Sequence, residues 1–247
     1  MSIYQKFAGV YDQMGEDNFS VRMFDYSKRI LAKLRYRPKT MLDLACGTGT
    51  AAVLWAQDNI KTFAIDGSAD MLEMARQKAK ECGVTIDFSQ QKMTEFSLPN
   101  RVDLVTSFFD SLNYLQTPKD LGQCFERVRE ALYPGAYFIF DVNTPEAMRV
   151  LWGGEIYADE TEDLAWIWKN NYYPKAKLAE VHATFFVKRK GAWERFDEVH
   201  AERGYTATEV KSALQKSGFK VVHLYDCLKF KKPGRDSMRI AAVATPR

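Results

Sequence analysis

The residues best suited to chemistry lie in a glycine-rich turn that spans Asp43 to Gly49 and in a carboxylate, Asp66, beyond it. Glycine lets a backbone approach a ligand closely and adopt a positive φ angle. A helix that begins after such a turn presents unpaired N–H groups to a polar or anionic ligand. Asp66 follows Gly47 by 19 residues, which suits a carboxylate that accepts hydrogen bonds from both hydroxyls of a ribose. The pattern indicates a nucleotide-type cofactor site.

The turn by itself fits two cofactors, because the run from Gly47 to Ala52 also matches the G-x-G-x-x-G/A pattern of nicotinamide dinucleotide sites. Three features favour S-adenosylmethionine. Asp43 lies inside the preceding strand, where its carboxylate can meet a cationic amino group. About forty residues precede that strand, whereas dinucleotide folds usually begin at the N-terminus. The C-terminal end also looks antiparallel. An NAD(P)-dependent oxidoreductase is the alternative, although the chain shows no evident Tyr-x-x-x-Lys pair.

The elements that must position this turn alternate between strand and helix. The first forty residues look helical up to Pro38, and Ser68 is a plausible helix N-cap. Strands alternating with helices argue for a parallel, doubly wound sheet. We expect a Rossmann-like α/β fold with seven strands, mostly parallel with one antiparallel strand. The expected strands are 41–45, 62–65, 84–88, 102–106, 136–142, 220–224 and 239–244, and the later helices 51–57, 71–79, 119–132 and 208–217.

Residues 150–205 interrupt this alternation. They are rich in aromatic residues and predict three antiparallel strands that begin near Leu164, Leu178 and Trp193, with turns near Pro174 and Lys190. We interpret the segment as an antiparallel β insertion that covers the active site as a lid, within a single domain of residues 1–247.

Composition narrows the partners. The net charge of +3 is too small to suggest a polyanion partner, so nucleic acid is not expected. No apolar run reaches the roughly 18 residues of a membrane helix, and the opening residues Met1 to Lys6 lack the apolar stretch of a signal peptide. The four cysteines are widely spaced, which indicates reduced thiols and no metal site. These features predict a cytoplasmic protein, either a monomer or a homodimer.

Four motifs in register resemble those of class I S-adenosylmethionine-dependent methyltransferases. The run from Leu42 to Gly49 resembles motif I, and Ala64 to Leu72 resembles motif II. Phe108 to Leu115 is similar to the segment after the fourth strand, and Leu132 to Phe140 to the L-x-P-G-G turn with its strand. Phe7 to Asp12 resembles the F-A-x-x-Y-D segment of bacterial small-molecule methyltransferases of the amino-sugar N,N-dimethyltransferase and glycine N-methyltransferase type.

The resemblance implies roles for particular residues. The methionine part of the cofactor would lie along the motif I turn, Asp66 would bind the ribose, and Met71 would pack near the adenine. Tyr11 would close over the cofactor, and Phe108 would contribute backbone near the sulfonium. The chain departs from the family after its third strand, where it reads Gln91-Lys92-Met93, because lysine cannot accept a hydrogen bond from the adenine amino group and only Gln91 or backbone is left to do so. The expected cofactor-binding set is Tyr11, Asp43, Ala45, Gly47, Gly49, Asp66, Gly67, Met71, Gln91, Lys92, Met93 and Phe108.

Methyl transfer from a sulfonium needs alignment and exclusion of water more than a catalytic triad. A nitrogen acceptor must also lose a proton, and His200 is the candidate base. The structural alternative is that this histidine only makes hydrogen bonds on its strand. The expected substrate-facing residues are Asp110, Asn113, Tyr114 and Arg203.

The sequence therefore predicts methylation of a small molecule at nitrogen or oxygen, since an enclosing insertion would build a closed pocket. RNA or protein is the alternative acceptor. A non-catalytic cofactor-binding protein is a third reading, suggested by Lys92 and by the absence of a clear base.

Overall fold

The computed structural model describes residues 4–247, so Met1 to Ile3 of the opening segment lie outside it. Its main sheet has seven strands in the order β10-β11-β5-β4-β1-β2-β3. Strand β11 runs antiparallel to both of its neighbours, and the other pairs are parallel. This confirms the predicted fold class. The strands are β1 (Thr40–Leu44), β2 (Lys61–Asp66), β3 (Ile86–Gln90), β4 (Val102–Ser107), β5 (Leu132–Asn143), β10 (Phe219–Asp226) and β11 (Arg239–Pro246).

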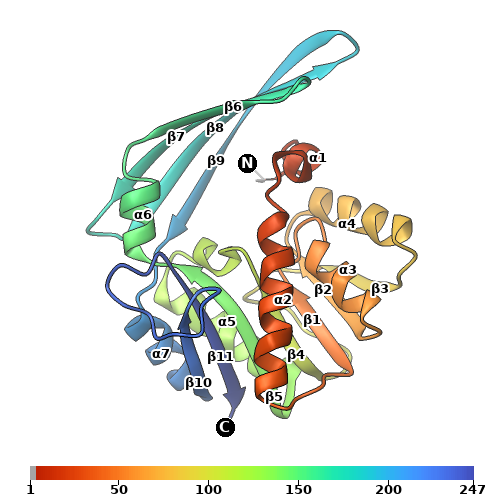
Figure 1. The fold of residues 1–247 in the computed structure, drawn as a ribbon, viewed down its shortest axis with the longest axis vertical. Helices are drawn as coiled ribbons and strands as arrows, with labels where there is room; N and C mark the ends of the chain where they lie inside the picture. The colour runs from red at the N-terminus through yellow and green to blue at the C-terminus, as the bar shows by residue number, and fades with distance from the viewer. Residues whose placement is uncertain (1–3) are drawn as a thin grey trace.

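Helices cover both faces of this sheet (Figure 1). Successive strand residues point to opposite faces, so Met41 packs with α2 (Asn18–Lys33) and α3 (Thr50–Gln57), whereas Leu42 packs on the side of α5 (Pro118–Ala131) and α7 (Ala207–Lys216). Ser68 caps α4 (Ala69–Glu81), because its side chain accepts a hydrogen bond from the Met71 amide, as predicted.

The N-terminal region differs from the long helix that its apolar spacing suggests. It is broken into α1 (Ala8–Tyr11), a 3-10 turn η1 (Asp12–Met14) and then α2. Gly15 follows η1 with a φ angle of 75°, a left-handed conformation that a helix cannot contain. The break lets the residues before Gly15 leave the axis of α2 and lie beneath the second sheet (Figure 1).

The second sheet has four antiparallel strands where the sequence predicted three. Its strands are β6 (Ile156–Glu160), β7 (Leu164–Tyr173), β8 (Leu178–Arg189) and β9 (Ala192–Arg203). Strand β6 was not predicted because every one of its residues is exposed at the sheet edge and carries no burial pattern. A short helix, α6 (Pro145–Leu151), leads from β5 into this sheet. The sheet arches over the carboxyl ends of the main strands (Figure 1).

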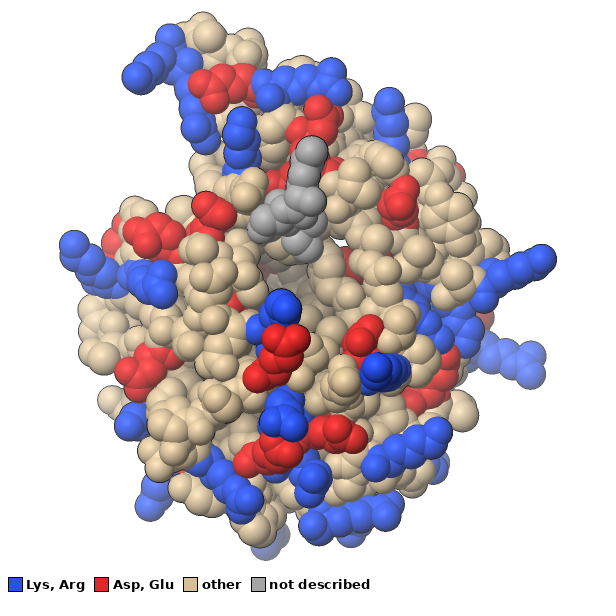
Figure 2. Space-filling view, turned by 180° about the vertical axis from the view of Figure 1, so that it is seen from behind, with Lys and Arg blue, Asp and Glu red and all other residues tan. Residues whose placement is uncertain are grey.

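Within residues 4–247, no helix combines the length and apolar character required to span a bilayer. Basic and acidic residues are interspersed on the face shown in Figure 2, without one continuous basic patch.

Candidate functional site

A cavity of about 690 Å³ lies between the carboxyl ends of the main strands and the inner face of the second sheet. The surface is hollowed between these two layers (Figure 2). Ligand sites in open α/β sheets occupy this edge, and ligand pockets typically measure about 300–1,000 Å³. The cavity collects most of the residues expected from the sequence: Tyr11, Ala45, Gly47, Asp66, Gly67, Met71, Lys92, Met93, Phe108, Asp110, Tyr114 and His200.

The glycine turn forms one end of the cavity, which we call the loop end (Ala45, Gly47 and Asp66). Ala45, Gly47 and Gly49 all have positive φ angles, of 57°, 54° and 79°. A Cβ atom on Gly49 would lie 2.8 Å from the Cβ of Ala75 in α4, so only glycine allows α4 to approach the start of α3 this closely. Gly49 thus holds the turn against α4 from behind, outside the cavity lining.

Asp66 ends β2 with its carboxylate at the loop end. Oδ2 accepts a 2.8 Å hydrogen bond from the Gly47 amide, and Oδ1 accepts one of 2.8 Å from the Ser68 amide. Burial raises the pKa of Asp66, while these amides oppose the shift. Each oxygen has further acceptor capacity, because a carboxylate offers about four lone-pair sites.

Like Gly49, the expected cofactor residues Asp43 and Gln91 lie outside the cavity lining. Asp43 is 2% exposed within β1, and its Oδ1 accepts a 3.0 Å hydrogen bond from Thr106 of β4. Burial raises the pKa of Asp43 to about 7. The Gln91 amide oxygen, which the sequence offered to adenine, accepts a hydrogen bond from the Ser97 amide. Lys92 lies exposed at the cavity rim, 3.5 Å from Glu95.

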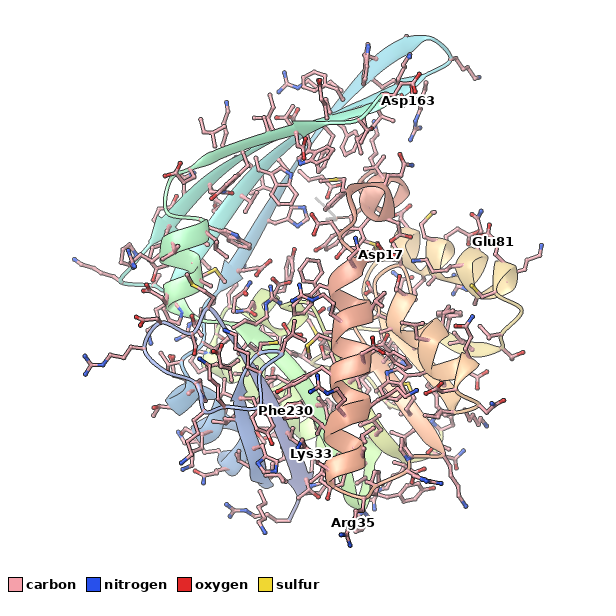
Figure 3. All side chains as sticks on the ribbon, viewed as in Figure 1. Asp17, Lys33, Arg35, Glu81, Asp163 and Phe230 are labelled. Carbon is pink, nitrogen blue, oxygen red and sulfur yellow. The ribbon has the colours of Figure 1, made fainter. Side chains whose placement is uncertain are left out.

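The N-terminal segment is tied to the loop end through a lysine of α4. Lys78 Nζ lies 2.7 Å from Asp12 Oδ2 and donates a 2.5 Å hydrogen bond to Thr50. Thr48 in the turn donates to Asp12 Oδ1 at 2.7 Å. Asp17, which directly precedes α2, lies 3.9 Å from Lys78 Nζ at the end of the helix that faces the second sheet, as labelled in Figure 3. These contacts hold Tyr11 at the cavity wall.

A second part of the cavity lining, here called the carboxylate end, contains Glu16, Asp110 and Glu202. Arg239 of β11 lies among them. Its guanidinium is 2.9 Å from Asp110 Oδ2 and 2.5 Å from Oδ2 of Asp141. Burial and the Asp110 charge raise the pKa of Glu16 to about 7, although Arg239 opposes this shift.

The backbone after β4 is held in a strained form at the carboxylate end. Phe109 and Asp110 have φ angles of 57° and 53°, a left-handed conformation that costs energy for residues with a side chain. The Asp141 carboxylate accepts hydrogen bonds from both amides, at 2.8 and 3.1 Å. Asp141 therefore fixes Asp110 in place, a relation between β5 and the loop after β4 that local sequence does not display.

His200 takes part in a chain of hydrogen bonds on the inner face of β9. Its Nδ1 lies 3.0 Å from the Tyr114 hydroxyl, which lies 2.5 Å from the Tyr4 hydroxyl. Its Nε2 lies 3.4 Å from Glu198, whose carboxylate accepts hydrogen bonds from the Tyr4 and Phe7 amides. His200 lines the cavity. Its proposed role as a base stays a prediction.

Asn113 and Arg203, expected to face a substrate, lie outside the cavity lining. Asn113 is fully buried, and its amide nitrogen donates to the carbonyl oxygens of Asn143 and Arg203 at 3.0 and 2.7 Å. Arg203 pairs with Glu209 at 2.6 Å. These residues join η2 (Ser111–Tyr114), β5 and β9, so the geometry gives them a bracing position.

Sequence reasoning missed Glu202, which lines the cavity and is 4% exposed. A signal was present, because Glu202 follows His200 by two residues and strand alternation places both on one face. Asn143 and Arg239 were also missed. They reach the cavity from the ends of β5 and β11, and no spacing in the sequence reveals that they meet.

Comparisons with known proteins agree with this geometry. A methyltransferase domain family matches residues 41–135. The chain is 33% identical to a protein of Geobacillus sp. (strain WCH70) named as a candidate methyltransferase, over 98% of both chains. It is 27% identical to dTDP-3-amino-3,4,6-trideoxy-alpha-D-glucopyranose N,N-dimethyltransferase of Streptomyces venezuelae, over 75% of this chain and 77% of that one. The crystal structure of an S-adenosylmethionine-dependent methyltransferase from Clostridium acetobutylicum ATCC 824 matches with a TM-score of 0.89 and 27% identity, covering 99% of each chain.

Membership of this family identifies the cofactor as S-adenosylmethionine and not a nicotinamide dinucleotide. The fold, the four motifs in register and these relatives lead to one assignment: the chain belongs to the class I S-adenosylmethionine-dependent methyltransferases.

Proposed function

We propose that this methyltransferase acts on a small molecule, at nitrogen or oxygen, that binds at the carboxylate end of the cavity. The observation that supports the proposal is the continuity of one cavity of about 690 Å³ from Asp66 at the loop end to Glu202 beneath the second sheet. Such a cavity suits a cofactor and a compact acceptor together, since sites of this size enclose small ligands.

The loop end fits the cofactor chemically. The Asp66 carboxylate has acceptor capacity left for ribose hydroxyls, and Met71 and Met93 offer apolar and polarisable contacts for an adenine ring. Ala45 and Gly47 would border the methionine part, and Phe108 and Tyr11 would lie near the sulfonium. The bound cofactor supplies an electrophilic methyl group. The chain supplies alignment of the two reactants and a covered site that excludes water.

The inner face of the second sheet would form the acceptor wall. Trp168, Val181, Ala183 and His200 reach the cavity from β7, β8 and β9, and Trp152 reaches it from the end of α6. A wall of this kind favours a small acceptor over a folded macromolecule, because it stands over the reacting end of the cavity. A relative with 27% identity carries the name of an amino-sugar N,N-dimethyltransferase, which supports a small acceptor for this chain as well.

Methyl transfer from cofactor labelled in its methyl group tests the proposal. The purified protein would be incubated with a panel of metabolites of low molecular mass and, separately, with tRNA and with protein extract. We expect label in one or more small molecules. Label that enters only RNA or only protein contradicts the proposal and selects the alternative acceptor.

A further inference from the structure

Glu202 stands out because one oxygen of its carboxylate is buried without a partner. Oε2 makes no hydrogen bond within residues 4–247, although Glu202 lines the cavity. Buried polar atoms normally find partners, so an orphaned one that borders a cavity points to a missing ligand. The Trp168 indole nitrogen and His200 Nε2, on the same cavity wall, also lack hydrogen bonds in the described residues.

The nearest cation does not neutralise Glu202. Arg239 is shared between Asp110 at 2.9 Å and Asp141 at 2.5 Å, and its guanidinium lies 4.3 Å from the ring centroid of Phe19. The Arg239 guanidinium thus pairs with the carboxylates of both Asp110 and Asp141. Glu16 and Glu202 add two more acidic groups to the same end of the cavity. If all four carboxyl groups ionised, this end would carry an excess of negative charge.

The surroundings of Glu202 disfavour its charged form. Burial and the Asp110 charge raise the pKa of Glu202 well above its ordinary value, whereas Arg239 and the hydrogen-bonding groups of Asn143 and Tyr114 lower it. A cation that binds beside Glu202 favours its ionised form, because the positive charge offsets the cost of burying the negative one. Once ionised, a carboxylate with a raised pKa can take up a proton. An ammonium group is such a cation and carries the proton with it.

His200 is less available for the same task. The Tyr114 hydroxyl lies within hydrogen-bond distance of Nδ1. Nε2 makes no hydrogen bond in the described residues, but it lies 3.4 Å from the Glu198 carboxylate, with which a protonated imidazole would pair. Glu198 in turn holds the backbone of the N-terminal segment through the Tyr4 and Phe7 amides. The imidazole is therefore part of a structural chain, while Glu202, two residues further along β9, keeps one oxygen without a hydrogen bond in the described residues.

From this geometry we propose that the methyl acceptor is an amine that enters as an ammonium ion between Glu202 and Asp110, and that Glu202 accepts its proton. The inference rests on the proposed function and names its substrate class. As the ammonium ion binds, Glu202 ionises and its own proton leaves to solvent. A proton then passes from the nitrogen to a carboxylate oxygen of Glu202, which leaves the nitrogen lone pair free. The nitrogen–carbon bond then forms as the carbon–sulfur bond breaks, and the electron pair stays on sulfur. The Trp168 indole N–H is a donor for an oxygen atom elsewhere on the acceptor.

Binding of a simple cation tests the ammonium site without turnover. Calorimetry would titrate cyclohexylammonium chloride, and separately cyclohexanol, into the protein saturated with S-adenosylhomocysteine. We expect the ammonium ion to bind at least about 10-fold more tightly than the alcohol, and Glu202→Gln to lose at least that factor. Glu194→Gln is the matched control, because Glu194 is an exposed residue of the same strand. Equal binding of both probes, or unchanged ammonium binding by Glu202→Gln, overturns the proposal.

Methyl transfer tests the proton acceptor. The panel would pair each amine, amino sugars included, with the alcohol of the same carbon skeleton. We expect label in amines only, a kcat reduced about 100-fold or more in Glu202→Gln with an unchanged KM for the cofactor, and partial recovery in Glu202→Asp, which keeps the carboxylate. Thermal melting would confirm that each variant is folded.

The two proposals fail in different ways. Transfer to alcohols alone, or a Glu202→Gln variant with wild-type kcat on an amine, refutes the ammonium site and leaves small-molecule methylation standing. Transfer only to RNA or protein refutes both.

Discussion

The amide nitrogen of Gly47 donates a 2.8 Å hydrogen bond to Oδ2 of Asp66, so the turn after β1 is fastened to the end of the neighbouring strand β2. This bond orients the carboxylate and at the same time supports the left-handed conformation of Gly47. The two motifs that resemble motif I and motif II in the sequence are therefore one structural unit. A change at either partner disturbs both.

Asp66→Asn is expected to weaken cofactor binding about 10- to 100-fold, the range of a lost hydrogen bond to a charged group. The amide keeps the shape of the carboxylate but brings an N–H group towards the Gly47 or Ser68 amide, each of which now donates to Asp66. Calorimetry with S-adenosylmethionine measures the effect. Asp87→Asn, an exposed change on β3, is the control and should bind normally. Equal affinities for the two variants would argue against a role for Asp66 in cofactor binding.

Gly49→Ala is expected to destabilise the fold by about 2 kcal/mol or more. The new methyl group would meet Ala75 Cβ at 2.8 Å and would sit on a residue with a φ angle of 79°. Gly122→Ala in α5 meets nothing within 4 Å and should stabilise by roughly 0.5–1 kcal/mol, because alanine favours a helix more than glycine does. Urea unfolding compares the two, and similar stabilities would contradict the close approach of α4.

Asp43→Asn should stabilise the cofactor-free protein more at pH 8.5 than at pH 5. The pKa of Asp43 in the folded state is about 7, so the native protein keeps a proton that the unfolded chain releases from about pH 4 upward. Stability of the wild type therefore falls as the pH rises towards 7 and then levels off. We expect the advantage of the variant to grow by roughly 2–3 kcal/mol over this range. Urea unfolding at both pH values measures it, and an advantage independent of pH would show that Asp43 ionises normally.

Lys78→Met should loosen the N-terminal segment. The variant removes the cation that lies 2.7 Å from Asp12 and 3.9 Å from Asp17, so both carboxylates lose this ion pair. Faster proteolytic cleavage within residues 8–17 and at least about 10-fold weaker cofactor binding are the expected results. Lys80→Met changes an exposed residue of the same helix and serves as the control. Identical cleavage rates in the two variants would show that Lys78 does not hold the segment.

Periodic patterns predicted the main sheet well because its strands and helices have distinct buried faces. The neighbours Met41 and Leu42 of β1 are both buried, on opposite faces of the main sheet, which requires helices on each face. The pattern failed where burial was absent or where one residue changed the backbone. Strand β6 is exposed along its whole length, and Gly15 breaks an otherwise helical spacing with a φ angle of 75°. The spacing of apolar residues reveals neither an exposed strand nor a left-handed glycine.

The loop end of the site was predictable since its residues are close in sequence and their order is typical of a family. Of the carboxylate end the sequence singled out only Asp110, because Asp110, Asp141, Glu202 and Arg239 come from four different parts of the chain and meet only in the fold. Gln91 was singled out from the sequence, but its side chain makes a different contact in the fold. Its amide was chemically suited to adenine, but the fold uses the oxygen for the Ser97 amide.

Strand β9 carries Glu198, His200 and Glu202 on one face, and its pairing with β8 sets Val181 opposite His200. Because side chains alternate along a strand, a slip of β9 by one residue would turn all three groups to solvent and bring Val199 and Ala201 inward. Glu198, which holds the N-terminal segment, the His200 imidazole and the Glu202 carboxylate therefore all reach the cavity side only when β9 keeps this register. An insertion or deletion of one residue in the β8–β9 hairpin would therefore displace all three side chains at once, even when it lies far from the cavity.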